Sequence, residues 1–169
     1  MRGLFSQPEY LHVLCNPVVT HVLPFGVLAM ILACFLRNRR AMIVALFVVA
    51  LSAAAAWPAV HYGEAAADRI QSIADTTGGQ WLKIHEYRAD RWAWVFYLTA
   101  GVAAAAIFLP WKWPKLGKPL TLAAFILGLI ACGAGAYIAW PAGKIRHREF
   151  RTGPPPAAEL KKAEQAEGD

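Results

Sequence analysis

Four uncharged stretches of 18 to 21 residues constrain this chain more than any other feature of its sequence. They cover residues 18–36, 41–60, 92–109 and 120–140. A helix needs about 20 apolar residues to cross the hydrocarbon core of a bilayer. Lipid offers no partner to an unpaired backbone group, so a chain that crosses it must be helical. The sequence therefore predicts an all-α integral membrane protein, an antiparallel four-helix bundle with short connections.

The composition agrees with a membrane protein of one domain. Hydrophobic residues make up 57% of the 169 residues and charged residues only 17%, and this length is typical of a single domain. We expect an interfacial lead-in over residues 1–17, a four-helix transmembrane domain over 18–140 and a polar, partly disordered tail over 141–169. Residues 64–74 place apolar side chains on one face, which predicts a short amphipathic periplasmic helix between the second and third spans.

The charges of the two short loops predict an orientation. Residues 37–40 and 112–118 carry six Lys and Arg residues and no acidic residue, whereas all eleven carboxylates lie on the other side. Short basic loops stay in the cytoplasm. We therefore expect a protein of the bacterial inner membrane with both termini in the periplasm. The net charge of +6 equals the charge of these loops, so it is no sign of nucleic-acid binding.

Three histidines occur close to the predicted periplasmic ends of the spans. His21 lies about one turn inside the first span, His61 follows the second, and His85 precedes the third. In an antiparallel bundle these three helix ends meet at one depth. An ionisable group near membrane depth is costly, so it indicates a function by default.

These histidines predict a b-type haem held by two imidazoles from facing helices. Histidine is a standard axial ligand of haem iron, and the cores of helix bundles are common cofactor sites. Arg88 and Arg91 follow His85 by three and six residues, a position from which guanidinium groups pair with the haem propionates. The Cys-x-x-Cys-His motif of covalent haem attachment is absent.

Two other interpretations of the histidines remain open. Interfacial imidazoles are often only hydrated, or bonded to a neighbouring backbone carbonyl. A mononuclear metal site is the second alternative, although it lacks a motif of fixed spacing. Its candidate ligands are His21, His61 and His85 with Glu64 or Glu86.

Three short motifs resemble a large, poorly characterised bacterial family of four-helix membrane proteins. Residues 16–24, Asn-Pro-Val-Val-Thr-His-Val-Leu-Pro, resemble the family's His-Pro-x-x-Val-His-Phe-Pro opening. Residues 62–66, Tyr-Gly-Glu-Ala-Ala, resemble its Thr-Gly-Glu-x-Ala segment, and His85-Glu86 resembles the His-Glu of its third helix. The likeness covers about residues 16–110. Asn16 stands in place of the first family histidine, and Val22 replaces the phenylalanine.

The resemblance implies a haem b protein, or a small membrane partner of an electron-transfer chain. It implies His21 and His85 as the ligand pair. Because Asn16 replaces the first family histidine, a role that needs this histidine would fall to His12 or His61.

The sequence thus predicts a cytochrome b-like electron-transfer subunit of a larger membrane complex. Its expected partners are the lipid bilayer and other membrane subunits, for example a cytochrome. No nucleophile–base arrangement, phosphate loop or nucleotide motif points to an enzyme, and transport is disfavoured because no span contains a charged residue. The alternative is a cofactor-free accessory subunit that packs against larger proteins through small residues. Such residues recur on the fourth span at Ala124, Gly128, Ala131, Gly135 and Ala139.

Overall fold

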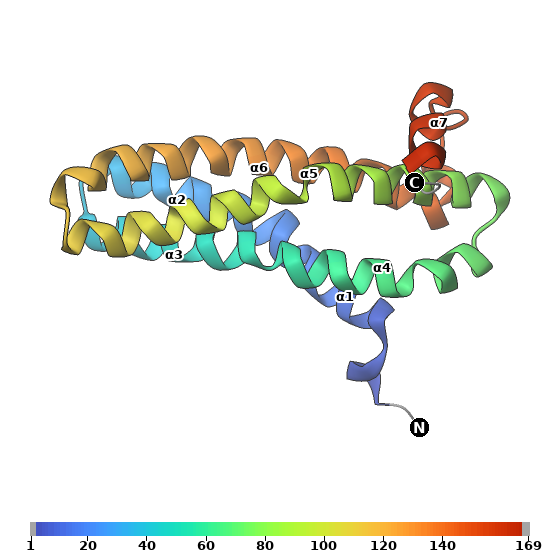
Figure 1. Cartoon of the computed structure of the whole chain (residues 1–169), viewed down its shortest axis with the longest axis horizontal. Coiled ribbons are helices and arrows are strands. Elements are labelled where there is room, and N and C mark those ends of the chain that lie inside the picture. The colour runs from blue at the N-terminus through green and yellow to red at the C-terminus, as the bar shows by residue number, and fades with distance from the viewer. Residues whose placement is uncertain (1–2, 167–169) are drawn as a thin grey trace.

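The computed structural model describes residues 3–166, which fold into helices joined by short connections (Figure 1). The longer helices are α1 (Pro8–Pro17), α2 (Leu23–Phe35), α3 (Arg39–Ala54), α4 (Ala56–Ile73), α5 (Thr76–Phe108), α6 (Gly117–Arg146) and α7 (Ala157–Ala166). Between them lie the π-helical turn η2 (Val18–Val22) and the 3₁₀ turns η1 (Leu4–Ser6), η3 (Leu109–Trp111), η4 (Pro114–Leu116) and η5 (Arg148–Phe150).

Within residues 3–166, four helical stretches are long and apolar enough to cross a membrane, which confirms for this part of the chain the prediction of an all-helical protein with four such helices. They are Pro8–Phe35, Arg39–Ile73, Thr76–Trp111 and Pro114–Arg146. The last three have 35, 36 and 33 residues, and helices of this length extend about 50 Å, well beyond a hydrocarbon core of about 30 Å. The excess lies at the end that carries the acidic residues, so the bundle has a polar extension.

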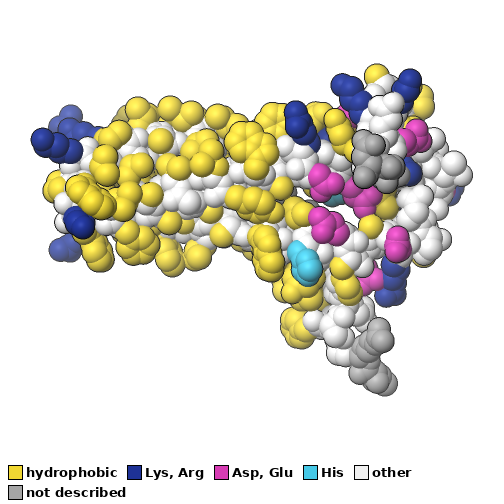
Figure 2. Space-filling model, in the orientation of Figure 1, with side chains coloured by type: hydrophobic (Ala, Val, Ile, Leu, Met, Phe, Trp, Pro, Cys, Tyr) yellow, Lys and Arg dark blue, Asp and Glu magenta, His cyan; other side chains and the backbone are white. Residues whose placement is uncertain are grey.

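The helices α5 and α6 pack along each other and form the long axis of the molecule (Figure 1). At one end α2 and α3 complete a four-helix bundle, and at the other end α4 continues beside α5 while α1 packs on α4. The two loops rich in Lys and Arg share the bundle end, and the acidic side chains gather at the opposite end (Figure 2). This separation agrees with the charge pattern of the sequence.

Proline accounts for two changes of helix direction. The chain bends between α1 and α2, where Pro17 is followed by the π-helical turn η2; proline and π-turns are the usual causes of helix bends. The break between α3 and α4 falls at Ala55. Pro58 has no amide hydrogen to donate to the Ala54 carbonyl, and proline is tolerated in the first turn of a new helix.

The segment 64–74 is helical but is not a separate element. It forms the second half of α4, which runs without interruption from Ala56 to Ile73. Gly63 is compatible with this helix because a single glycine costs only about 1 kcal/mol relative to alanine. The amphipathic helix of the sequence analysis is therefore the extension of the second apolar helix.

Helix α5 begins at Thr76, two residues before the glycine pair at 78 and 79. The Asp75 carboxylate accepts a hydrogen bond of 2.7 Å from the Gly78 amide, which is the N-cap arrangement that begins a helix. Gly78 also lies against α6, so close that a Cβ there would collide with the Ile145 carbonyl oxygen. Gly78 allows α5 to approach α6 closely, and it lies inside α5 and not at its end.

Small residues on α6 are used for packing inside the chain. Of the predicted stripe, Ala124, Gly128, Ala131 and Gly135 are buried, and a Cβ on Gly128 would lie 2.9 Å from the Val27 side chain of α2. This lets the two helices approach closely. The buried part of the stripe is therefore not a surface for another subunit.

The described part of the tail folds back onto the polar end of the molecule. Within it α7 packs against α5, and Asp75 joins the start of α5 to the tail. The Asp75 carboxylate bonds Arg151 Nη1 at 2.9 Å and Arg148 Nε at 2.8 Å. Arg151 also donates to the carbonyls of Lys144 and Ile145 at the end of α6.

We expect acid to weaken this junction through Asp75. The hydrogen bond from Arg151 is the main cause that lowers the pKa of Asp75 from 3.8 to about 2. A lowered carboxyl pKa stabilises the fold above the unfolded-state pKa, and this contribution is lost as the pH falls from about 4 to about 2. Melting curves of the full chain in detergent should show a smaller loss of melting temperature over this range in Asp75→Ala than in the parent chain. Substitution of the exposed Asp68 should leave the pH dependence unchanged.

Candidate functional site

A cavity of about 680 Å³ opens in the polar end between α1, α4, α5 and α6. Sites for small molecules and cofactors typically measure roughly 300–1,000 Å³. Its lining includes His12 of α1 and His85 of α5, together with the carboxylates of Glu64, Glu86 and Asp90. Figure 2 shows a hollow flanked by acidic side chains at this end of the molecule. The cavity therefore brings two histidines from different helices, His12 and His85, next to one space that a ligand can enter.

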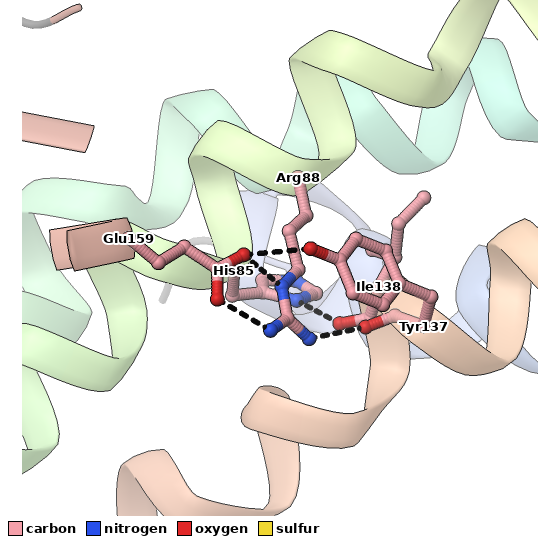
Figure 3. Close-up of polar contacts among 5 residues, drawn as sticks. All are labelled: His85, Arg88, Tyr137, Ile138 and Glu159. Atoms are coloured by element: carbon pink, nitrogen blue, oxygen red, sulfur yellow. Dashed lines mark hydrogen bonds and ion pairs between the residues drawn. The ribbon is translucent and has the colours of Figure 1, made fainter. Parts of the chain in front are cut away.

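His85 is held against α6 by a hydrogen bond to the main chain. Its Nδ1 lies 2.8 Å from the carbonyl oxygen of Ile138 (Figure 3). A carbonyl oxygen only accepts, so Nδ1 carries the hydrogen and Nε2 keeps its lone pair. This is the tautomer that binds a metal through Nε2, and such an orienting bond is typical of metal-ligating histidines.

Pro141 explains why a neighbouring carbonyl of α6 is open to α5. The Tyr137 carbonyl would bond the amide of residue 141 in a regular helix, but proline has none. Arg88 Nη1 donates to this oxygen at 2.7 Å instead. Arg88 lies one turn after His85 on α5, so two side chains of α5 bond the consecutive carbonyls of Tyr137 and Ile138.

Arg88 is also paired with the tail. Its Nε and Nη2 donate to the two carboxylate oxygens of Glu159 at 2.7 and 2.8 Å, and the guanidinium carbon lies 3.8 Å from the centre of the Tyr137 ring. The Arg88 side chain is only 6% exposed. Hydrogen bonds from Arg88 hold the pKa of Glu159 below its ordinary value. Figure 3 shows the guanidinium enclosed between α7 and α6.

The structure places both predicted propionate partners away from the cavity. Arg88 is committed to Glu159 and Tyr137, and Arg91 is exposed beside a separate groove under α7. The cationic residues that line the cavity are Lys83 and Arg146. The two arginines were predicted as propionate partners because they follow His85 closely in the sequence. In the structure, these positions lie on the face of α5 that turns toward the tail.

His12 is held in the same way as His85, but by α4. Its Nδ1 lies 2.7 Å from the Ala59 carbonyl oxygen, which leaves Nε2 with its lone pair. Gly63 provides the space for the ring, because a Cβ at this position would lie 3.0 Å from His12 Nδ1. The glycine of the Tyr-Gly-Glu-Ala-Ala segment thus has a structural role beside the histidine.

The rings of His12 and His85 are neighbours in the cavity and meet edge to face. Their centres are 6.4 Å apart and their planes meet at 85°. A metal–imidazole bond is about 2.0 Å, and a ring nitrogen lies about 1 Å from its ring centre, so two imidazoles in line on one metal hold their centres about 6 Å apart. The 6.4 Å between the ring centres is therefore close to the spacing of two imidazoles on one metal ion.

His21 and His61 lie elsewhere. His21 is exposed, and its Nδ1 lies 2.9 Å from Thr20 Oγ1. His61 is also exposed and stacks on Trp57, with ring centres 5.6 Å apart. Neither lines the cavity. The structure therefore brings together His12 and His85, whereas the predicted pair of His21 and His85 is not brought together at this cavity.

Helix geometry separates His21 from His12. The two residues are nine positions apart, about two and a half turns of a regular helix, and the π-helical turn η2 shifts the phase further. The two rings therefore do not share a face. His12 lies in the segment expected to be an interfacial lead-in, so only the departure at Asn16 drew attention to this histidine.

The alternative metal site finds no support in the described residues. Between residues 3 and 166, no group of three or more His, Cys, Asp or Glu side chains is placed to hold a metal ion.

Comparison with known proteins returns no relative: no family model matches the chain, and no match was found among curated proteins or solved structures.

Proposed function

We propose that this chain is a multi-pass protein of the bacterial inner membrane that holds one b-type haem and passes electrons within a larger membrane complex. The observation that carries the proposal is the pair of His12 and His85. Both rings line one cavity, both have Nδ1 on a backbone carbonyl, and their centres are 6.4 Å apart.

In this proposal, separate residues of the chain would bind the iron, orient the ligands and pair with the propionates. His12 and His85 bind the iron through Nε2, and the carbonyls of Ala59 and Ile138 fix the orientation of the rings. Lys83 and Arg146, the cations that line the cavity, pair with the propionate carboxylates. A bound haem supplies reversible one-electron chemistry, and its potential depends on the axial ligands and the surrounding charges.

The orientation follows from charge. The end with the two acid-free basic loops faces the cytoplasm, which puts the cavity, η1 and α7 on the periplasmic side. The cavity spans the boundary between the uncharged stretches, which contribute residues such as Val19 and Phe96, and the polar extension, which contributes Glu64 and Glu86. A haem there is near the membrane surface, where a periplasmic or membrane-bound redox partner has access to it.

The reduced-minus-oxidised absorption spectrum of the purified full chain tests the proposal. The chain should be expressed with an ample supply of haem and purified from the membrane fraction in detergent. We expect sharp bands of a low-spin b-type haem, at one haem per chain. A featureless visible spectrum, even after haem is added to the purified chain, would contradict the haem proposal. The cofactor-free accessory subunit would then be the remaining candidate function. Recovery of the chain outside the membrane fraction would contradict the membrane placement itself.

A further inference from the structure

A second, smaller cavity lies on the other side of α5, under the tail helix. It measures about 440 Å³, and we call it the tail groove. Its lining includes Arg91 and Trp92 of α5, Tyr137 of α6, and Glu159 and Lys162 of α7. The groove has no part in the histidine site, because neither His12 nor His85 lines it.

The tail groove has an excess of positive charge. Its carboxylate, Glu159, uses both oxygens on Arg88 and also accepts a hydrogen bond of 2.7 Å from the Tyr137 hydroxyl. Arg91 and Lys162 are exposed, and no ion pair joins either of them to a carboxylate in the described chain. The groove is lined by three cations, Arg88, Arg91 and Lys162, and by one carboxylate, Glu159, so its lining carries an excess of positive charge that favours an anionic ligand.

The groove also lies at the level where lipid headgroups are expected. Trp92 is the first residue of the third uncharged stretch. Its ring contacts the Tyr137 ring edge to face, with centres 6.5 Å apart, and the two residues are 37% and 44% exposed. Tryptophan and tyrosine are enriched at the boundary between hydrocarbon and water. An apolar surface thus continues directly below the cationic groove.

We propose that the tail groove binds the phosphate of an anionic phospholipid. Arg91 and Lys162 pair with the phosphate oxygens from α5 and α7, and Trp92 and Tyr137 contact the glycerol and the first part of the acyl chains. The lipid would thereby join the tail helix to the transmembrane bundle. This inference rests on the membrane placement proposed above and not on the haem.

Lipid binding by the full chain tests the inference, with two matched single-charge variants. Lys162→Gln removes a cation from the groove. Lys161→Gln removes the same charge from the preceding residue of α7, which does not line the groove. The purified chain is titrated with phosphatidylglycerol or phosphatidylcholine in mixed micelles, and bound lipid is counted by native mass spectrometry. Inorganic phosphate serves as a competitor.

We expect the parent chain to retain phosphatidylglycerol in preference to phosphatidylcholine. Lys162→Gln and Arg91→Gln should each weaken this binding about fivefold, since one cation near a lipid surface contributes about 1 kcal/mol. Lys161→Gln should bind as the parent does, and melting curves show whether each variant is folded. Equal loss in the Lys161 and Lys162 variants would overturn the inference. So would an absence of preference for phosphatidylglycerol, or full displacement of the lipid by phosphate alone.

Discussion

His12→Gln and His85→Gln are each expected to abolish the sharp low-spin haem spectrum of the purified chain. Loss of an outer-shell partner of a metal site typically costs about 10- to 100-fold in affinity, and loss of a direct ligand should cost more. Glutamine keeps an amide N–H that can bond the carbonyl of Ala59 or Ile138, so the helix contacts are disturbed little. The measurement is the reduced-minus-oxidised spectrum at equal protein concentration.

The other two predicted ligands provide the matched controls. His21→Gln and His61→Gln alter exposed residues that lie outside the cavity, and we expect both variants to keep the parent spectrum. Retention of the haem in His12→Gln together with its loss in His21→Gln would show that the pair first predicted from the sequence is correct. Loss in all four variants would point to a general effect on folding, which melting curves of the same samples would reveal.

The helices could be predicted from the sequence because each one is indicated by a continuous run of uncharged residues. A run of about 20 uncharged residues must be helical to cross lipid. The small residues at Gly128 and Gly135 could be recognised as packing positions from their spacing. The boundaries were harder to predict. The break at Ala55 depends on Pro58, three residues later, and the start of α5 depends on the cap formed by the Asp75 side chain.

The candidate site was only half predictable. His85 precedes an apolar span and was recognised, whereas His12 lies in a short helix whose docking on α4 no local pattern indicates. Its position requires Gly63, about 50 residues later, to leave space for the ring. The position of Arg88 likewise requires Pro141 on another helix and Glu159 in the tail. Contacts between segments far apart in the chain have no signature in one sequence.

Glu159→Gln is expected to destabilise the chain strongly, because it breaks a buried ion pair. The side chains of Arg88 and Glu159 are 6% and 18% exposed, and removal of one partner leaves the other charge buried and uncompensated. Such changes cost about 3 kcal/mol or more, far above the loss of a surface pair. The free energy of unfolding in detergent should fall accordingly, and α7 should become more accessible to protease.

Two control variants and the pH dependence show whether the loss of stability comes from the ion pair or from a general effect on α7. Glu164→Gln changes an exposed carboxylate of the same helix and should have little effect. The double variant Arg88→Met with Glu159→Leu should recover most of the lost stability, since replacing a whole buried pair by apolar groups is often neutral or better. Because Arg88 holds the pKa of Glu159 below its ordinary value, the contribution of the pair is present above that ordinary value and is lost as the pH falls through the lowered pKa.

The double variant also shows what the tail does for the histidine site. Arg88 donates to the Tyr137 carbonyl, next to the Ile138 carbonyl that orients His85. If the arginine only fastens the tail, the double variant regains stability and keeps the parent haem spectrum and midpoint potential. A recovered melting temperature with an altered spectrum would instead show that the bond to Tyr137 sets the position of α6 against His85. A Glu159→Gln chain as stable as the parent would contradict the buried-pair argument from which both expectations follow.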